Sequence, residues 1–262
     1  MNKNSSFFMI TIITVWCIFH VFPIVNAVDI VVHDNHSSYV SSVGTFHVVG
    51  EVENTGIQSV AFVSVTGTFY DSNNTIIVTE SSFATLEIIP PDVKSPFEVV
   101  VTDQNQAEKV HNYSLAVTQH SITTKNLTKT LIILSNSSHI SPSGFLNIVG
   151  EVKNNGSSES TSTRVAATCY DENGKVVAIE SGFTDPPNLN PEQTTQFNLM
   201  IDDENQSAKV DNYVFQVQSI EAILIPEFPL SYIFVFLTLL FTLVILRRTK
   251  DLDSISPFQI KF

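Results

Sequence analysis

Hydrophobic and polar residues alternate along most of the chain, which is the pattern of β-strands with one buried face. Residues 46–53 alternate between an apolar row that begins at Phe46 and a more polar row that begins at His47. Residues 61–69 alternate in the same way, and short polar turns such as Asn54-Thr55-Gly56 separate the runs. The central part of the chain has no long amphipathic helical pattern. We therefore predict an all-β fold.

The alternating runs occur twice, at a constant offset of 100 residues. The matched segments are Val49-Gly-Glu-Val-Glu-Asn54 with Val149-Gly-Glu-Val-Lys-Asn154, Tyr70-Asp71 with Tyr170-Asp171, Glu80-Ser81 with Glu180-Ser181, and Lys109-Val110-x-Asn112-Tyr113 with Lys209-Val210-x-Asn212-Tyr213. Solenoid repeats are only about 20–50 residues long, so this period predicts two whole domains in tandem. We place a first β-sandwich at residues 28–127 and a second at residues 128–225.

Comparison of the two copies indicates which face of each strand is buried. Apolar character is kept in the row of Val65 and Phe69, which become Val165 and Cys169, and it is lost in the opposite row, where Phe62 becomes Ser162. Further inward rows are Phe46, Val48, Gly50 and Val52; Phe97, Val99 and Val101; and Phe197, Leu199 and Ile201. Cys169 is then a small core residue and not a reactive thiol. Six or seven short strands per copy are typical of an immunoglobulin-like β-sandwich.

The N-terminus has the pattern of a secretory signal peptide over residues 1–27. Lys3 precedes an apolar run from Phe7 to Val25, and Val25-Asn26-Ala27 offers small residues for cleavage before Val28. An uncleaved signal anchor is the alternative. Cys17 lies inside this run and is not preceded by a lipoprotein cleavage box, so we do not expect lipidation there. Cys169 would then be a lone cysteine, which rules out a disulfide framework.

A second apolar run, Leu230 to Leu246, precedes the basic cluster Arg247-Arg248-Thr249-Lys250. At about 1.5 Å per residue the run is about 25 Å long, slightly short of a bilayer core unless Phe228 and Pro229 are included. Basic residues at a membrane edge stay in the cytoplasm. We therefore expect residues 28–225 to lie outside the cell, residues 226–250 to contain the membrane segment with its basic stop, and residues 251–262 to form a short cytoplasmic tail.

Charge and hydropathy describe different parts of the chain. The 262 residues carry a formal charge of -13, yet their mean hydropathy is +0.17. The apolar residues are concentrated at the two ends, while residues 28–229 contain only 8 Lys and Arg against 24 Asp and Glu. So acidic a surface repels phosphate backbones, and nucleic-acid binding is excluded.

The conserved pattern of the two copies resembles the FxLYD module. The resemblance is carried by Gly-Glu-Val-x-Asn, by the strand ends Phe69-Tyr70-Asp71 and Cys169-Tyr170-Asp171, and by the proline and phenylalanine before a later strand. It covers about residues 28–225. The family consists of β-sandwich accessory domains in exported bacterial and archaeal proteins, and the resemblance implies no enzymatic activity.

The segment before the C-terminal apolar run is similar to the PEF-type sorting signal of archaeal surface proteins. Pro226, Glu227 and Phe228 match its motif, and an apolar helix and a basic cluster follow. The resemblance implies processing by a membrane enzyme of the archaeosortase class. Residues 251–262 depart from the family, whose signals usually end sooner. The alternative is a plain membrane anchor in which the prolines end one element and begin the next.

Candidate chemistry in the two copies is sparse, and we predict no catalytic residue, cofactor or metal ligand. The duplicated carboxylates Glu51/Glu151, Asp71/Asp171 and Glu80/Glu180 are candidates for calcium, with turn-capping aspartates and solvent-facing glutamates as the alternative. Asp103 and Asp203 are expected to cap a single helical turn. The histidines, of which His33 and His36 are the closest pair, are not repeated as histidines in the second copy. No familiar nucleophile-and-base motif is present.

Sequons for N-glycosylation are frequent in the middle of the chain. They fall at Asn35, Asn73, Asn112, Asn126, Asn136, Asn155 and Asn205. Their number suits a glycosylated surface protein.

Taken together, the sequence predicts a non-catalytic, exported protein that displays two sandwiches from a membrane anchor, in a structural or adhesive role or as an accessory subunit of an envelope assembly with a protein partner. The alternative is an extracellular protein that binds glycan or Ca²⁺, for which Tyr39, Phe62 and Phe83 are candidate exposed aromatic residues.

Overall fold

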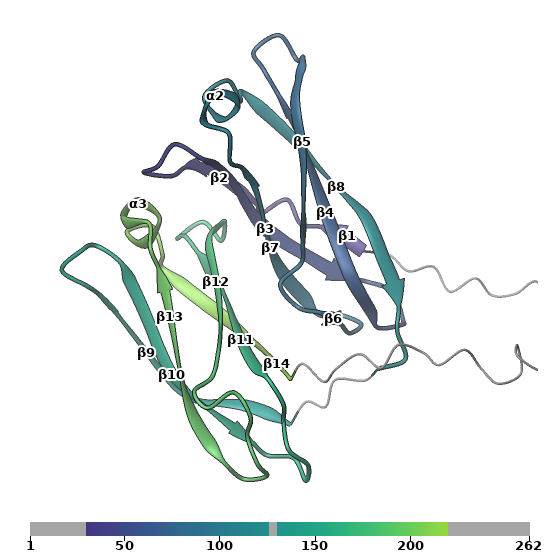
Figure 1. Ribbon diagram of the computed structural model, residues 1–262, viewed down its shortest axis with the longest axis vertical. Helices are drawn as coiled ribbons and strands as arrows, with labels where there is room; N and C mark the ends of the chain where they lie inside the picture. The colour runs from purple at the N-terminus through teal and green to yellow at the C-terminus, as the bar shows by residue number, and fades with distance from the viewer. Residues whose placement is uncertain (1–29, 126–129, 220–262) are drawn as a thin grey trace, which may run out of the picture. The chain divides into compact units, whose positions relative to one another are not determined.

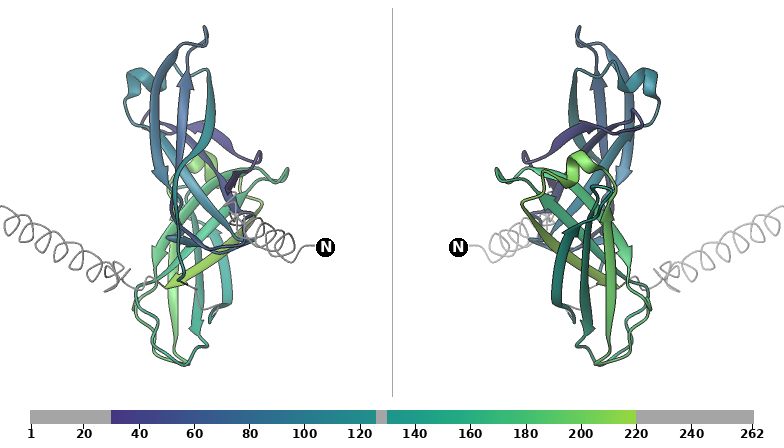
Figure 2. Two further views of the ribbon diagram at one scale, coloured as in Figure 1. Left: turned by 90° about the vertical axis from the view of Figure 1, so that its right-hand side faces the viewer. Right: turned by 90° about the vertical axis from the view of Figure 1, so that its left-hand side faces the viewer.

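The computed structural model describes residues 30–125 and 130–219, which contain two sets of strands and two single-turn helices (Figure 1). The first set is β1 (Ile30–Val32), β2 (Ser37–Val40), β3 (Phe46–Asn54), β4 (Val60–Tyr70), β5 (Ile76–Phe83), β6 (Ile88–Ile89), β7 (Lys94–Val101), α2 (Gln104–Ala107) and β8 (Asn112–Ile122). The second is β9 (Leu131–Ile140), β10 (Leu146–Asn154), β11 (Thr163–Tyr170), β12 (Val176–Phe183), β13 (Thr194–Ile201), α3 (Glu204–Ser207) and β14 (Asn212–Ser219). Two further views show how fully strands dominate the described chain (Figure 2). The predicted all-β class is confirmed.

Each set of strands forms two antiparallel sheets. In the first set, β3 pairs with β1, β2 and β7, and β4 pairs with β5, β6 and β8. In the second set, β10 pairs with β9 and β13, and β11 pairs with β12 and β14. We call β1–β8 the first sandwich and β9–β14 the second sandwich. Both belong to one compact unit of the chain.

The predicted inward rows form the two cores. In the first sandwich, Val65, Phe69, Phe97, Val99 and Val101 are fully buried in one cluster. In the second, the core cluster contains Val165, Cys169, Phe197, Leu199 and Ile201. Each cluster takes side chains from both of its sheets, so the sheets of a sandwich face one another across a shared apolar layer. The inward rows predicted from the alternating pattern are therefore confirmed.

Gly50 and Gly150 stand in inward rows because a phenylalanine ring occupies the space of their missing side chains. A Cβ added at Gly50 would lie 2.8 Å from Cζ of Phe97, and one at Gly150 would lie 2.6 Å from Cζ of Phe197. The paired strands place each ring directly opposite its glycine, in the register Gly50 with Phe97 and Gly150 with Phe197. The repeated Gly-Glu-Val motif thus has a packing cause.

The two single-turn helices begin as the sequence predicted. Asp103 caps α2, and its side chain accepts from the backbone N–H of Gln106 at 3.1 Å. Asp203 caps α3 through the equivalent bond to Gln206 at 3.0 Å. Such caps satisfy a backbone donor that the first helical turn leaves without a partner.

The predictions for the two ends of the chain lie outside the described residues. They are the signal peptide at residues 1–27, the motif Pro226–Phe228, the apolar segment that follows it and the tail at residues 251–262. Among the residues that the structure describes, no helix is long and apolar enough to cross a membrane.

Candidate functional site

The duplicated aspartates Asp71 and Asp171 each organise a tight turn. Oδ1 of Asp71 accepts from the backbone N–H groups of Asn73 and Thr75, both at 2.8 Å. Oδ1 of Asp171 accepts from Asn173 and Lys175 in the same way. The bond from Thr75, above all, holds the pKa of Asp71 below its usual range, because it favours the charged carboxylate. The turn-capping interpretation of these aspartates is confirmed.

Asn54 and Asn154 fasten a loop in each sandwich through three hydrogen bonds of the side-chain amide. Nδ2 of Asn54 donates to the carbonyl oxygens of Gln58 (2.7 Å) and Ile89 (2.8 Å), and Oδ1 accepts from the N–H of Gly56 (3.0 Å). Asn154 makes the equivalent three bonds in the second sandwich. The sequence comparison placed this asparagine at the end of a strand and the start of a turn. Its three side-chain hydrogen bonds explain why both copies have it.

Glu51 is a buried carboxylate at the contact between the two sandwiches. It lies on the outer face of β3, yet its exposed fraction is 0%. Oε1 accepts from the hydroxyl of Tyr170 at 2.7 Å, Oε2 accepts from Nδ2 of Asn35 at 3.1 Å, and Nζ of Lys94 lies 3.7 Å from Oε2. Burial, and then the bond to Glu51, raise the pKa of Tyr170. The expectation that this glutamate faces solvent is wrong, because the second sandwich covers it.

Further contacts join the sandwiches on either side of Glu51. The backbone N–H of Val176 donates to the carbonyl oxygen of Asn35 at 2.8 Å, and the hydroxyl of Ser37 donates to the carbonyl oxygen of Val176. Some distance away, the buried side chain of Gln218 donates to the carbonyl oxygen of Ile88 (2.9 Å) and accepts from the N–H of Glu87 (2.8 Å). These bonds give the sandwich contact a defined register.

The calcium hypothesis has no geometric support in the described residues. Glu51 is bonded to protein donors, Asp71 and Asp171 are occupied by turn N–H groups, and Oε2 of Glu151 accepts from the hydroxyl of Ser135 at 3.2 Å. No group of three or more His, Cys, Asp and Glu side chains within residues 30–125 and 130–219 could hold a metal ion. The duplicated carboxylates therefore do not converge.

His33 and His36 each have their own partner. Nε2 of His33 lies 2.6 Å from Oε2 of Glu53, and Nδ1 of His36 lies 2.8 Å from the hydroxyl of Tyr113. Burial of His36, followed by the charge of Lys175, lowers the pKa of this imidazole. The pair His33 and His36 does not form a shared site.

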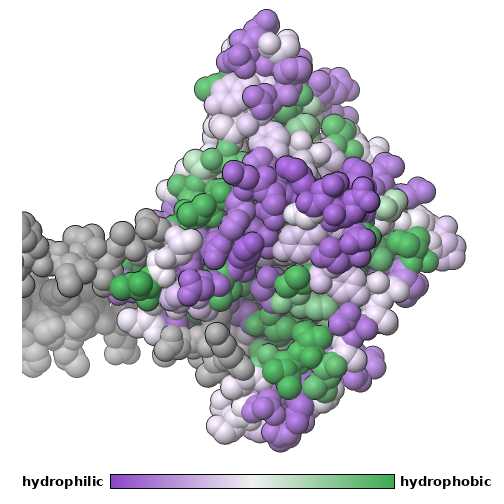
Figure 3. Space-filling model, turned by 180° about the vertical axis from the view of Figure 1, so that it is seen from behind, coloured by the Kyte–Doolittle hydropathy of each residue, from purple (hydrophilic) through white to green (hydrophobic). Residues whose placement is uncertain are grey.

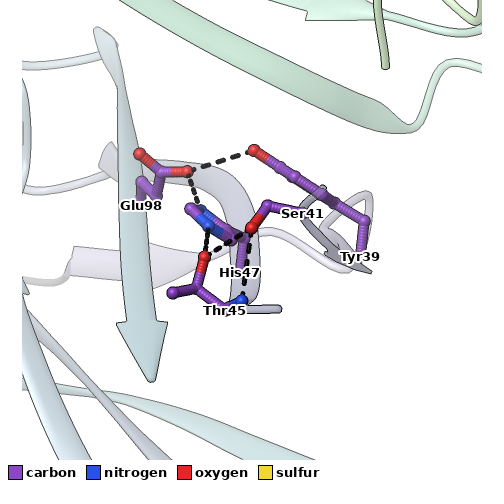
Figure 4. A network of polar contacts seen from close by, with 5 residues as sticks. All are labelled: Tyr39, Ser41, Thr45, His47 and Glu98. Carbon is purple, nitrogen blue, oxygen red and sulfur yellow. Dashed lines mark hydrogen bonds and ion pairs between the residues drawn. The ribbon is translucent and has the colours of Figure 1, made fainter. Parts of the chain in front are cut away.

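Thr45, His47 and Glu98 form a polar relay on the first sandwich (Figure 4). The hydroxyl of Thr45 lies 2.6 Å from Nε2 of His47, and Nδ1 of the same ring lies 2.7 Å from Oε1 of Glu98. Tyr39 stacks on the imidazole at 4.7 Å between ring centroids and donates to Glu98 at 3.4 Å. The order hydroxyl, imidazole, carboxylate is that of an activated nucleophile. No sequence motif pointed to it; the signal is the same-face spacing of Thr45 and His47 beside a strand that carries Glu98.

Part of this relay is a hairpin fastening that both sandwiches have. Ser41 Oγ lies 2.6 Å from the hydroxyl of Thr45 and accepts from its backbone N–H at 3.2 Å. In the second sandwich, Ser141 accepts from the N–H of Phe145 at 3.1 Å in the same turn. There the threonine is replaced by phenylalanine, and the positions of His47 and Glu98 are Asn147 and Asn198. The hairpin therefore forms without the relay.

The candidate aromatic residues have different surroundings. Phe62 and Phe83 are exposed, and so is Phe183, the counterpart of Phe83. The guanidinium carbon of Arg164 lies 5.9 Å from the ring centroid of Phe183. On the face seen in Figure 3, apolar residues gather in several separate patches among hydrophilic ones. Only the Phe83 and Phe183 pair repeats between the copies.

The predicted sequons lie on several elements. Exposed asparagines occur at Asn73, Asn112, Asn136, Asn155 and Asn205. Asn126 lies outside the described residues. The side chain of Asn35 is different because its Nδ2 donates to buried Glu51.

Comparisons with known proteins place the chain in no family. No protein-family model and no curated protein matches it. Among solved structures, it is similar to the exo-chitosanase CsxA of Amycolatopsis orientalis, at 12% identity over 70% of this chain and 25% of that one, with a TM-score of 0.25. It is also similar to the transglutaminase of red sea bream, at 8% identity over 71% of this chain and 29% of that one, with a TM-score of 0.22. The chain thus spans about a quarter of the length of these structures, and the TM-scores are too low to support any argument.

Proposed function

We propose that this chain is a non-catalytic surface protein that presents two immunoglobulin-like, FxLYD-type sandwiches outside the cell from a C-terminal membrane anchor. Its role is structural or adhesive, or that of an accessory subunit in an envelope assembly. The observation that carries the proposal is that the residues shared by both copies have structural roles. The side chains of Asn54, Asp71, Asp103 and their counterparts form hydrogen bonds with backbone groups of loops, turns and helix ends.

The two ends of the chain support the location. Residues 1–27 have the pattern of a signal peptide, and an apolar segment with a basic stop follows Pro226–Phe228. In this proposal residues 28–225 are outside and residues 251–262 are inside unless an archaeosortase-type enzyme removes them. Glycans on exposed turn sequons such as Asn73 and Asn155 would add to the hydrophilic surface.

Treatment of intact cells with a protease, followed by mass spectrometry of the membrane fraction, tests this location. We expect peptides from residues 30–219 to be released without lysis and the mature protein to begin at Val28. An intact segment from Arg247 to Phe262 would favour a plain anchor over processing. Release of the sandwiches only after lysis would overturn the proposal of surface display.

A glycan-binding role is the second candidate, supported by the repeated exposed rings of Phe83 and Phe183. An exposed aromatic ring offers a flat apolar face on which a sugar ring can stack. Glycan-array binding by the full-length protein, compared with a Phe83→Ala/Phe183→Ala variant, separates the two roles. Binding that the double variant loses would favour the second role.

The Thr45 relay is the feature that argues most for an enzyme. Hydrolysis of activated esters by the purified chain and by a Thr45→Val variant tests it. Turnover that disappears in the variant would contradict the non-catalytic assignment, whereas equal background rates in both would support it.

A further inference from the structure

Equivalent residues of the two sandwiches differ in burial on the outer face of one sheet. In the first sandwich, Val49 and Glu51 on β3 have exposed fractions of 0%. Their counterparts Val149 and Glu151 on β10 are only partly buried. The residues are identical, so the difference comes from what lies on top of them. The second sandwich covers the first through Tyr170 and Val176.

The opposite sheets show the complementary difference. In the second sandwich, Thr168 on β11 and Val176 on β12 are fully buried, although Thr168 does not belong to the core row. Their counterparts in the first sandwich, Thr68 and Ile76, are less buried, and Ile76 is 60% exposed. Each sandwich therefore has one face that is not covered by the other sandwich. In the first sandwich it is the outer face of β4, β5 and β8, and in the second it is the outer face of β9, β10 and β13.

Three residues of the contact within the chain have identical counterparts on these open halves. Glu151 stands where Glu51 does, and Tyr70 stands where Tyr170 does. Ser137 replaces Ser37, whose hydroxyl reaches the carbonyl oxygen of Val176. Ser135 donates to Glu151 as Asn35 does to Glu51, whereas Thr194 stands at the position of Lys94.

The open face of the first sandwich carries no charged side chain in its outward row, although the molecule is strongly acidic. The outward row of β4, β5 and β8 includes Thr66, Thr68, Tyr70, Ile76, Thr79, Ser81, Asn112, Ser114 and Ala116, none of which carries a carboxylate or an amine. On the other face, Glu151 and Asp185 border a hollow of about 880 Å³, lined also by Ser135, Ser137, Val149, Gln196 and Asn198. The uncharged row therefore places no like charge opposite Glu151 or Asp185 when the two faces meet.

We propose that the chain associates head to tail with a second copy of itself, the Tyr70 and Ile76 face of one first sandwich docking on the Glu151 face of another chain's second sandwich. In this contact the Tyr70 hydroxyl donates to Glu151, as Tyr170 does to Glu51 within the chain. The two faces differ, so the contact is heterologous and leaves one free face at each end. Unless the rotation closes a ring, the product is an open chain of molecules.

The contact between chains is expected to be weaker than the contact within one chain. Gln218 and Lys175, which both bond across the intrachain contact, correspond to Thr118 and Thr75 on the open face. The intrachain contact also has the advantage of its linker, which keeps the partners at a high effective concentration. Association should therefore depend on protein concentration.

This inference specifies the partner for the structural role proposed above, but the contact itself does not depend on the cellular location. A chain that proves intracellular would overturn surface display and leave the contact to be tested. A chain that is displayed but remains monomeric would overturn the contact alone.

Cysteine cross-linking between two full-length variants tests the register. One carries Ser137→Cys and the other Ile76→Cys, because Ser37 and Val176 touch in the intrachain contact. After mixing in detergent and mild oxidation, we expect a disulfide between positions 76 and 137, identified by mass spectrometry of the linked peptide. The control mixture pairs Ser137→Cys with Ile57→Cys, a position that is 71% exposed and lies outside both faces. Equal cross-linking in the two mixtures would overturn the proposal.

A charge reversal tests the same contact without cysteines. Glu151→Lys should weaken concentration-dependent association of the full-length protein by about tenfold or more in sedimentation velocity, since it removes the acceptor of Tyr70. Glu159→Lys makes the same charge change at an exposed loop position outside the face and should leave association unchanged. Monomers at every concentration, or equal association of both variants, would contradict the inference.

Discussion

The hydroxyl of Tyr170 donates a 2.7 Å hydrogen bond to the carboxylate of Glu51, and 119 residues separate the two in sequence. The carboxylate is fully buried, so each of its donors replaces water that the contact has excluded. One donor of this buried carboxylate thus comes from the other sandwich, and it helps to fix how the two sandwiches lie together.

Tyr170→Phe should lower the free energy of unfolding by about 2 kcal/mol, because it leaves one oxygen of a buried carboxylate without its donor. The control is Tyr213→Phe, which makes the same change where the hydroxyl donates to exposed Asn136 at 3.1 Å. It should cost less than about 0.5 kcal/mol. Urea denaturation of both variants measures the difference, and equal effects would contradict a special role for the Glu51 bond.

Asn54→Asp should destabilise the first sandwich by about 3 kcal/mol. The substitution replaces an amide that donates to two carbonyl oxygens with a carboxylate that repels them. Asn155→Asp is the matched control, because Asn155 is exposed. Thermal unfolding followed by circular dichroism should show a lower Tm for the first variant only. A small effect of Asn54→Asp would mean that the loop reorganises around the new charge.

His36 should make the protein less stable in weak acid. Its pKa is lowered in the folded state, so the unfolded chain binds more protons between that lowered value and the ordinary value near 6.5. This contribution to stability is present above about pH 6.5 and is lost as the pH falls toward the folded-state pKa. His36→Asn introduces the residue found at position 136 and should reduce the loss on acidification. Denaturation at about pH 7.5 and pH 5 measures it; identical pH dependence would contradict the assignment.

Cys169 should resist thiol reagents in the native protein. Its side chain is fully buried, and burial raises the pKa of the thiol to about 12. A thiolate is the reactive form, so labelling should require unfolding. Mass spectrometry after treatment with iodoacetamide, with and without about 6 M guanidinium, shows whether residue 169 is modified. Rapid labelling of the native protein would mean that this part of the core opens readily.

The inward rows could be predicted from sequence because they depend on a local rule. A residue such as Val65 or Phe97 is buried by the opposite sheet of its own sandwich, and alternation reports that directly. Comparison with the second copy showed which face is buried, because Val165 and Phe197 keep the apolar character that the solvent-facing row loses.

The state of the outer rows could not be predicted in this way. Glu51 and Glu151 are the same residue in the same motif, and alternation places both outside. What buries one of them is the contact between sandwiches, a relationship of surfaces far apart in the chain. The relay of Thr45, His47 and Glu98 was missed for a similar reason, because it requires the register in which Val49 pairs with Glu98.

The unequal burial of the two Gly-Glu-Val motifs bears on how this gene can vary. Substitutions that are tolerated at Glu151 in an isolated molecule should be selected against at Glu51. In a chain with its two repeats exchanged, Ile76 and Thr118 would stand where Val176 and Gln218 now make the contact between the sandwiches. The duplication therefore produced two copies that are no longer interchangeable, and the order of the repeats is itself an inherited trait.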